Sequence, residues 1–336
     1  MVEPLAIATP RGFFAAATGL ARRWGTIFAA ALLCAGCVAI ARHAAMARSA
    51  SGDAPVKVLV DELPRTYLIH VPATAPAGGF PVILVFHGGG GQATGVIRLT
   101  RLDPLADRRG FLAVYPNGIG RHWNDGRSTI RNKSDDVRFV DVILDDLARR
   151  YPVDPARIYA TGISNGAMFT ERLGCERSGR FAAIAPVSGT LPADMAPSCR
   201  PAQPVSVLQI GGTADPIMPF NGGAVADFGG WGEGGLVLSV PDTVERWALA
   251  DGCAPPAPPV ALPPIKPADG TSVTQQIFAP CRSGKQVVVL TINGGGHTWP
   301  GGFPYLPARI IGPVSHQLDA SEAIVDFLLS QPRRRS

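Results

Sequence analysis

Charged side chains are scarce in this sequence. They make up 17% of its 336 residues, and the formal net charge is only +5. No basic stripe interleaved with aromatic residues occurs, and the densest basic cluster is the C-terminal run Arg333-Arg334-Arg335. A nucleic-acid partner, which would need such a surface, is therefore not expected. The low charge, with 39 glycines and 32 prolines, also argues against a helical rod or a disordered chain.

Signals for metals and cofactors are missing as well. The cysteines beyond residue 47 do not have the spacing of a zinc site. The glycine-rich stretch 88–91 lacks the Lys-Ser or Lys-Thr ending of a phosphate-binding P-loop. The sequence predicts neither a metal nor a cofactor.

The N-terminal segment 1–47 has the pattern of an export signal. Arg22 and Arg23 precede the apolar run 26–40, and Ala45-Met46-Ala47 offers a small-residue cleavage site. The run is shorter than the roughly 20 apolar residues of a membrane span. We expect a secreted or periplasmic protein.

Two alternatives for this segment stay open. The long region before the arginines is compatible with an uncleaved membrane anchor. The stretch Leu33-Cys34-Ala35-Gly36-Cys37 resembles a bacterial lipoprotein box, which would place a lipid on Cys37, although Cys34 stands where leucine is usual. Any membrane association is expected through this segment alone.

Four cysteines lie beyond the export segment, and an even number in an exported chain predicts two disulfides. Three pairings are possible. We favour Cys175 with Cys199 and Cys253 with Cys281, because each pair closes a local loop. Buried free thiols in a cytosolic chain are the alternative.

Apolar runs alternate with helical patterns between residues 54 and 330. The order predicts an α/β fold in which a mostly parallel central sheet is covered by helices on both faces, in a single domain 54–330. A basic, disordered tail is expected at 331–336. The expected strands are 56–60, 65–71, 81–86, 111–115, 157–161, 182–187, 205–210, 271–278 and 286–292, and the expected helices are 102–109, 135–149, 167–173, 242–250 and 319–329.

Gly162-Ile163-Ser164-Asn165-Gly166 follows one of these strands and precedes a helix. A Gly-x-Ser-x-Gly sequence at that position is typical of a nucleophile elbow, a turn so sharp that only glycine fits on either side of the serine. The segment predicts Ser164 as a catalytic nucleophile, against an ordinary strand–helix turn.

A serine hydroxyl needs a base and an orienting carboxylate, which follow the elbow in the order acid, then histidine. His297 lies in a glycine-rich loop after an apolar strand, whereas His316 lies just before the last helix. Asp215 follows a strand at the sheet edge where α/β folds place ligand sites, and Asp242 is the weaker alternative. Ser164, Asp215 and His297 are the predicted triad.

Backbone amides would stabilise the oxyanion of the tetrahedral intermediate. One is predicted at Asn165, at the head of the elbow helix, and the others at Gly88, Gly89 and Gly90 after the strand 81–86. His87 is expected to shape this loop and not to act as the base.

Several of these segments together resemble the polyhydroxybutyrate-depolymerase and feruloyl-esterase group of α/β-hydrolases. The similarity covers about residues 54 to 330 and includes 135–149, 159–168, 181–189 and 296–301. The resemblance implies a secreted serine esterase in which Ser164, Asp215 and His297 form the triad. It also implies a Cys175–Cys199 bridge.

The chain departs from the polymer-degrading members of that group, since it shows no threonine-rich linker and no separate C-terminal polymer-binding domain. Soluble or oligomeric esters, such as hydroxyalkanoate oligomers and feruloyl or acetyl esters, are therefore the expected substrates. Trp123, Trp299 and Trp231 are candidates to line the substrate pocket, with ordinary packing as the alternative.

The sequence thus predicts a carboxylic ester hydrolase that forms an acyl-enzyme. A serine peptidase of the same fold is the second hypothesis, although such peptidases usually carry an additional domain. A catalytically inactive surface-binding protein built on the same scaffold is the third, and the ordered Ser, Asp and His argue against it.

Overall fold

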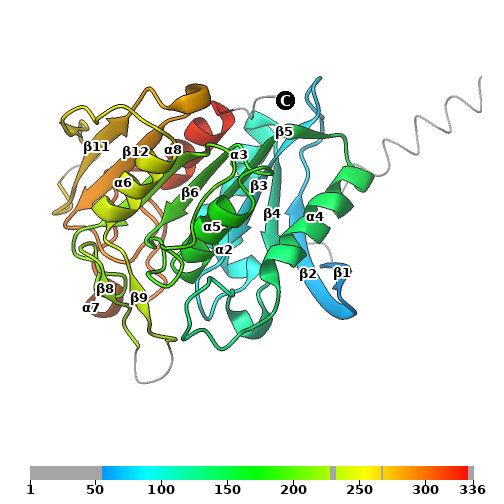
Figure 1. The fold of residues 1–336 in the computed structure, drawn as a ribbon, viewed down its shortest axis with the longest axis horizontal. Helices are drawn as coiled ribbons and strands as arrows, with labels where there is room; N and C mark the ends of the chain where they lie inside the picture. Colours follow the sequence, from blue (N-terminus) through cyan, green and yellow to red (C-terminus); the bar gives the residue numbers. More distant parts are fainter. Residues whose placement is uncertain (1–54, 228–231, 266–267, 332–336) are drawn as a thin grey trace, which may run out of the picture. The chain divides into compact units, whose positions relative to one another are not determined.

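A computed structural model describes residues 55–227, 232–265 and 268–331 of the protein. A mixed ten-stranded sheet forms its centre (Figure 1). Its strands are β1 (Val56–Val60), β2 (Leu63–His70), β3 (Phe80–Phe86), β4 (Leu112–Pro116), β5 (Val153–Ile163), β6 (Ala183–Val187), β7 (Ser206–Gly212), β10 (Val260–Ala261), β11 (Ser272–Phe278) and β12 (Val287–Asn293). The helices are α2 (Ala93–Thr100), α3 (Leu102–Arg109), α4 (Asp136–Arg150), α5 (Asn165–Glu176), α6 (Val240–Ala250), α7 (Ala308–Ile311) and α8 (Ala320–Leu329).

The strand order is β1-β2-β4-β3-β5-β6-β7-β12-β11-β10. The central strands from β4 to β12 run parallel to one another, whereas antiparallel strands extend the sheet at both edges. A short pair, β8 (Gly223–Ala224) and β9 (Leu236–Val237), lies outside this sheet. The predicted α/β fold with a mostly parallel sheet is confirmed.

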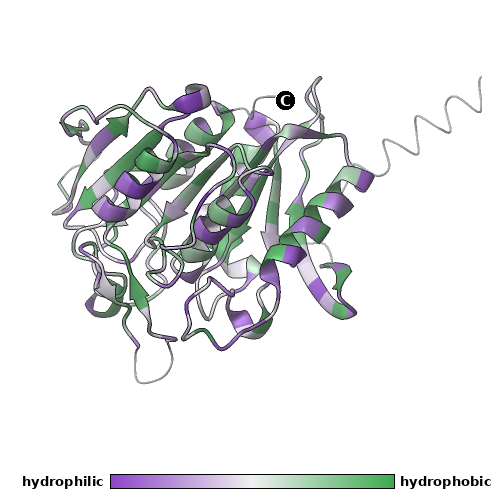
Figure 2. Cartoon of the chain, in the orientation of Figure 1, coloured by the Kyte–Doolittle hydropathy of each residue, from purple (hydrophilic) through white to green (hydrophobic). Residues whose placement is uncertain are grey.

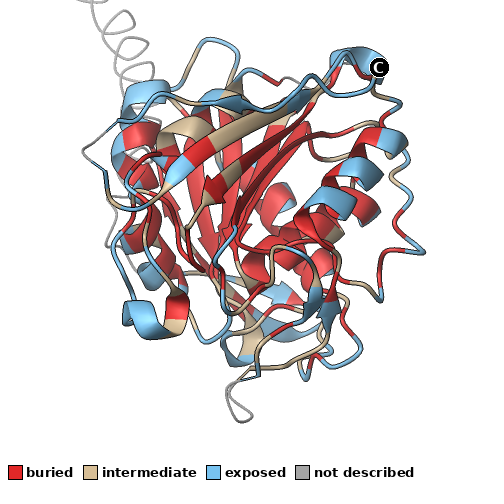
Figure 3. Ribbon diagram, turned by 90° about the vertical axis from the view of Figure 1, so that its left-hand side faces the viewer, coloured by how far each residue is buried: buried red, intermediate tan, exposed pale blue. Residues whose placement is uncertain are grey.

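The sheet separates two hydrophobic cores. Helices α4, α5 and α6 lie on one face and α2, α3 and α8 on the other (Figure 1). Along β3, Val82 and Leu84 belong to the first core, and Ile83 and Val85 belong to the second. Successive side chains of a strand point to opposite faces, so a strand with two covered faces needs a continuous apolar run. Figure 3 shows the resulting buried strands between helices that are exposed on their outer sides.

Helix α4 illustrates how the sequence sets the helices. The side chain of Asp135 caps its start by accepting a hydrogen bond from the Arg138 amide at 2.8 Å. Its buried residues, which include Val140, Ile143 and Leu147, recur at helical spacing, so one face packs on the sheet and the other stays polar (Figure 2).

Several elements of the fold were not expected from the sequence, namely α2, α7, β10 and the pair β8 and β9. Helix α2 was not predicted, because it follows directly on the glycine-rich loop and carries a glycine itself. The proline-rich stretch 255–267 contains strand β10, which pairs antiparallel with β11 and so belongs to the same sheet.

Some predictions fall outside the described residues. These are the export segment 1–47 with its lipidation box at Cys37, Trp231, and most of the tail 331–336. Within the described ranges, no helix combines the length and the apolarity that crossing a membrane requires.

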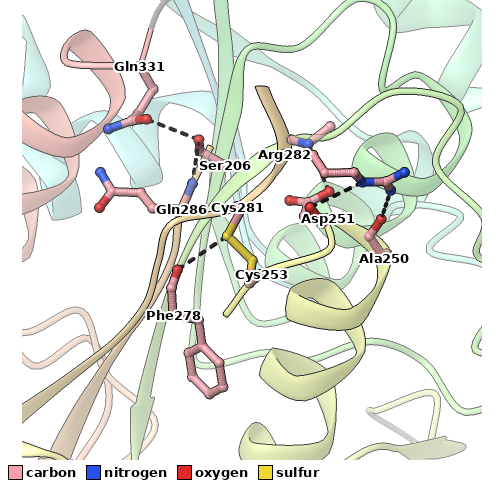
Figure 4. Close-up of a disulfide and its surroundings, with 10 residues drawn as sticks. Ser206, Ala250, Asp251, Cys253, Phe278, Cys281, Arg282, Gln286 and Gln331 are labelled. Carbon is pink, nitrogen blue, oxygen red and sulfur yellow. Dashed lines mark hydrogen bonds between the residues drawn. A yellow bond between two sulfur atoms is a disulfide. The ribbon is translucent and has the colours of Figure 1, made fainter. Parts of the chain in front are cut away.

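The two disulfides pair as predicted. Cys175 is bonded to Cys199, and Cys253 to Cys281. In Figure 4 the second bridge joins the chain just after α6 to the segment that leads into β12, and Arg282 adds a hydrogen bond from its amide to the Asp251 carbonyl at 2.9 Å. Two disulfides fit a protein that folds outside the cytoplasm.

We expect the double substitution Cys253→Ala with Cys281→Ala to lower the free energy of unfolding by about 3 kcal/mol, because a 28-residue separation is no longer closed in the unfolded chain. Urea unfolding followed by circular dichroism measures this loss. A variant as stable as the oxidised wild type would contradict the expectation.

The elbow helix α5 carries a fully buried carboxyl group. Glu171 of α5 accepts a hydrogen bond from the Trp247 indole at 2.6 Å, and its other oxygen has no partner among the described residues. Burial raises the pKa of Glu171 from 4.5 to about 8. The folded protein therefore keeps this proton at neutral pH, whereas the unfolded chain releases it.

This difference predicts a pH-dependent stability. The contribution of Glu171 is fully present below pH 4.5 and is lost as the pH rises towards 8, at roughly 1.4 kcal/mol per pH unit. We expect Glu171→Gln to gain stability over the wild type as the pH is raised from 5 to 9, measured by thermal unfolding. Glu176→Gln, at the exposed end of the same helix, serves as the control. If the stability of the wild type and of Glu171→Gln changed in parallel between pH 5 and pH 9, the raised pKa of Glu171 would be refuted.

Candidate functional site

Ser164 occupies a strained turn between β5 and α5. Its φ of +59° and ψ of −123° are sparsely populated by residues with a side chain. A Cβ atom at Gly162 would lie 2.6 Å from the Gly166 carbonyl oxygen, and one at Gly166 would lie 2.5 Å from the His87 carbonyl oxygen. Both glycines are therefore required by close backbone approach, as the elbow sequence predicts.

The elbow is anchored to the neighbouring strand and opens on a cavity. The Ser164 amide donates a hydrogen bond to the Val187 carbonyl at 3.0 Å. Ser164 itself is only partly buried, and it lines a cavity of about 460 Å³. His297 lines the same cavity.

Asp215 and His297 lie side by side, although 82 residues separate them in the chain. The Asp215 Oδ2 atom is 2.8 Å from His297 Nδ1, and both side chains are almost fully buried. The other carboxylate oxygen of Asp215 accepts hydrogen bonds from the Ile217 and Met218 amides, each at 2.8 Å. The carboxylate is thus fixed in its loop and holds the imidazole through Nδ1.

The loops that carry these two residues are joined by hydrogen bonds. The Ala214 amide donates to the Gly295 carbonyl at 2.9 Å, and the Gly294 amide donates to Thr213 Oγ1 at 2.8 Å. Parallel pairing of β7 with β12 continues directly into these contacts. A Cβ at Gly295 would press on Ile292, which is why this loop needs glycine.

Tyr305 supports the histidine from a segment that the sequence analysis did not consider. Its hydroxyl donates a hydrogen bond to the His297 carbonyl oxygen at 2.7 Å, and its ring lines the cavity. Burial and the nearby Asp215 charge raise the pKa of Tyr305. The hydroxyl therefore stays protonated and remains a donor.

The loop after β3 lies against the elbow as predicted, with one correction. A Cβ at Gly88 would lie 3.4 Å from Ser164 Cβ, and one at Gly89 would lie 3.7 Å from Asn165 Cβ. The Gly90 amide, however, donates to the Arg121 carbonyl at 2.9 Å. Gly90 is thereby removed from the predicted oxyanion donors, and Gly88 and Gly89 are left as the candidates of this loop.

His87 keeps the loop in shape. Its Nδ1 is 2.8 Å from the Gly88 carbonyl, and its Nε2 accepts a hydrogen bond from the Gly118 amide at 3.1 Å. Burial lowers the pKa of His87 to about 4, so the ring is neutral and its proton is held on Nδ1. This arrangement agrees with a structural role.

The side chain of Asn165 is held by a buried network. It accepts a hydrogen bond from the Trp123 amide at 2.8 Å and donates one to Asp125 Oδ2 at 2.6 Å. Asp125 in turn pairs with Arg127 at 2.8 Å. The network fixes the first residue of α5, whose backbone amide is the other oxyanion candidate. Asp125 and Arg127 lie two residues apart in a loop and form no recognisable sequence motif. The sequence analysis therefore identified neither of them.

The predicted substrate-binding role of two tryptophans is corrected. Trp123 is fully buried, donates to the His87 carbonyl at 2.9 Å and stacks on Phe169. Trp299 is buried against α8, where its indole donates to Ser321 Oγ at 3.0 Å. Neither ring lines the cavity, so we assign both to packing.

The two alternative triad residues lie elsewhere. His316 is exposed, and its amide donates to Asp269. Asp242 bonds to Ser239 at the start of α6. In the part of the chain that the structure describes, no cluster of His, Cys, Asp or Glu could hold a metal ion.

The cavity is lined by both apolar and charged residues. The apolar ones include Val96 and Leu99 of α2 and Phe303 and Leu306 of the segment after His297. Arg127 and Glu233 are charged lining residues, and we call this pair the charged wall. Ser164 and His297 lie in the same cavity.

Known proteins resemble this chain over most of its length. Residues 65–230 match the family described as esterase PHB depolymerase. The chain is 37% identical over 305 residues to the protein named putative esterase NocK of Nocardia uniformis subsp. tsuyamanensis, a match that covers 87% of this chain and 88% of that relative. It is 27% identical over 223 residues to feruloyl esterase B of Piromyces equi, covering 65% of this chain and 39% of that longer relative.

Solved structures show the same fold. An acetyl xylan esterase from Aspergillus awamori aligns with a TM-score of 0.52 at 17% identity, covering 73% of this chain and 94% of that one. A thermostable esterase aligns with a TM-score of 0.54 at 15% identity, covering 83% of this chain and 63% of that one. The peptidase hypothesis finds no support in these names. The chain belongs to the esterase PHB depolymerase family and is a carboxylic ester hydrolase.

Proposed function

We propose that this protein is an exported serine esterase that cleaves soluble or oligomeric carboxylic esters through an acyl-enzyme. Ser164 is the nucleophile, His297 the general base and Asp215 the residue that orients the imidazole. The amides of Asn165 and of Gly88 or Gly89 stabilise the oxyanion. Export is supported by the two disulfides and by the predicted signal in 1–47.

Asp215 contacts His297, and His297 lines the same cavity as Ser164; this arrangement carries the proposal. A carboxylate can only accept a hydrogen bond, so Nδ1 of the imidazole holds the proton. Nε2 is then the nitrogen that can accept the proton of a serine hydroxyl, which is the tautomer that a general base requires.

The reaction follows from these roles. Ser164 Oγ attacks the ester carbonyl carbon while His297 Nε2 takes its proton, and the carbonyl oxygen becomes the oxyanion. Collapse of the tetrahedral intermediate breaks the bond to the alcohol, which leaves with the proton from His297. A water molecule then repeats the sequence on the acyl-enzyme and releases the carboxylic acid.

The cavity supports small or oligomeric substrates. Its volume of about 460 Å³ suits a ligand of modest size. Hydroxyalkanoate oligomers and feruloyl or acetyl esters are the proposed substrates, in line with relatives named feruloyl esterase and acetylxylan esterase.

We expect Ser164→Ala to retain less than about 1% of the wild-type kcat on p-nitrophenyl butyrate, because loss of a triad nucleophile costs several orders of magnitude. Ser330→Ala, an exposed serine at the end of α8, is the matched control and should keep full activity. Labelling by a fluorophosphonate probe should disappear only in the first variant. Retained turnover or labelling in Ser164→Ala would overturn the proposal.

Asp215→Asn is expected to lower kcat by about 10³–10⁴-fold with little change in KM, since an amide no longer holds the imidazole in the required tautomer. Steady-state kinetics on the same ester separates the two constants. Asp242→Asn tests the alternative carboxylate. If that variant lost the activity and Asp215→Asn did not, the roles would have to be exchanged.

A further inference from the structure

A turn at the end of β6 contacts both the nucleophile and the loop of the base. The Val187 carbonyl accepts a hydrogen bond from the Ser164 amide at 3.0 Å. The next residue, Ser188, donates a hydrogen bond from its Oγ atom to the Thr298 carbonyl at 3.0 Å. Thr298 directly follows His297 in the chain. Two neighbouring residues therefore connect the backbone of the nucleophile to the loop of the base.

Ser188 adopts a backbone conformation that favours glycine. Its φ is +48°, in the left-handed region, although it carries a side chain. Its amide donates to the Ile210 carbonyl at 2.9 Å, a bond that a glycine would make equally well. What serine adds over glycine is the hydroxymethyl group, which is buried and bonded to the Thr298 carbonyl. Residues held in such strained conformations cluster at functional sites.

The turn is fixed on the side of the nucleophile. A Cβ atom at Gly189 would lie 2.6 Å from the Ser164 carbonyl oxygen and 2.7 Å from the Ala167 Cβ atom. The Gly189 carbonyl accepts a hydrogen bond from the side-chain amide of the fully buried Gln209 at 2.9 Å. The Ser188 hydroxyl therefore holds the Thr298 carbonyl from a position that is fixed relative to Ser164.

The histidine loop has further supports, which come from other segments. The His297 amide donates to the Ile311 carbonyl, and the Tyr305 hydroxyl donates to the His297 carbonyl. Asp215 contacts the imidazole at Nδ1. These contacts fix the loop to the segment that follows it and to the loop of the acid. The bond from Ser188 connects the loop to the turn that holds the nucleophile.

We infer that Ser188 is a positioning residue whose hydroxyl holds the His297 loop at the distance and orientation from Ser164 that proton transfer requires. A general base must lie within hydrogen-bond reach of the proton it takes, and a displacement of about 1 Å can cost about 10²-fold in rate. Ser188 is buried and is not among the residues that line the cavity, so it acts through His297 and not on the substrate. This inference rests on the proposed triad.

Ser188→Ala removes the hydroxyl and keeps the Cβ atom. We expect kcat on p-nitrophenyl butyrate to fall by about 10- to 100-fold with KM within about twofold of the wild type, because His297 serves both formation and hydrolysis of the acyl-enzyme. The rate constant of labelling by a fluorophosphonate probe should fall by a similar factor, since Ser164 needs the same base there. Rates are referred to the number of sites that the probe has labelled at completion.

A second variant separates activity from stability. Ser188→Gly also lacks the hydroxyl, but it relieves the left-handed conformation. It should therefore unfold at a higher temperature than Ser188→Ala and still show the same loss of kcat.

Thr190→Val is the matched control, two residues farther along the chain. The buried Thr190 Oγ1 atom donates to the Leu238 carbonyl at 2.7 Å, so it makes a bond of the same kind to a segment other than the histidine loop. This variant should keep the kcat and the labelling rate of the wild type.

Three results would overturn the inference. Wild-type kcat and labelling rate per labelled site in Ser188→Ala and Ser188→Gly would show that the hydroxyl does not position the base. A rise in KM with kcat unchanged would place its role in substrate binding. A loss of kcat in Thr190→Val as large as that in Ser188→Ala would assign the effect to a general loosening of the fold. A wild type that neither hydrolyses the ester nor is labelled at Ser164 would instead contradict the proposed function.

Discussion

The site depends on backbone segments that approach more closely than side chains allow. At Gly162 and Gly166 the strand–helix turn touches the chain end of β3, and any Cβ there would overlap carbonyl oxygens. Close backbone approach that leaves no room for a Cβ atom also occurs where the loop of Asp215 meets the loop of His297. Strand pairing brings β3, β5, β7 and β12 into one sheet, and the glycines let their ends meet, so the four loops converge on one cavity.

Rigidity around this cavity comes from buried polar contacts. His87, kept neutral by burial, spans the loop after β3, and the Asn165–Asp125–Arg127 network fixes the start of α5 and reaches the charged wall. Tyr305 holds the histidine loop through a hydrogen bond to the His297 carbonyl oxygen. Because each group is paired and little exposed, the nucleophile, base and oxyanion candidates are positioned before a substrate arrives, which is the condition for electrostatic stabilisation of a transition state.

The sequence predicted the elements whose signals are local. Apolar runs predicted the central strands, the helical patterns 135–149 and 319–329 predicted α4 and α8, and the elbow glycines predicted the turn at Ser164. Residues defined by contacts across the fold were missed, since Asp125, Tyr305 and Glu233 carry no pattern of their own. Trp123 and Trp299 were wrongly predicted to line the substrate pocket. The sequence around an aromatic residue does not show whether its ring faces the core or the cavity. Gly90 was misassigned because its amide partner, Arg121, lies in a separate loop.

The central claim is that Ser164, His297 and the two backbone segments act on one carbonyl group. A crystal structure of the protein inhibited by a phosphonate ester tests it most directly. The account predicts phosphorus bonded to Ser164 Oγ, with the phosphoryl oxygen about 2.7–3.1 Å from the amides of Asn165 and of Gly88 or Gly89, and with the imidazole of His297 facing Oγ. Phosphorus on another residue, or an imidazole turned away from Ser164, would contradict it.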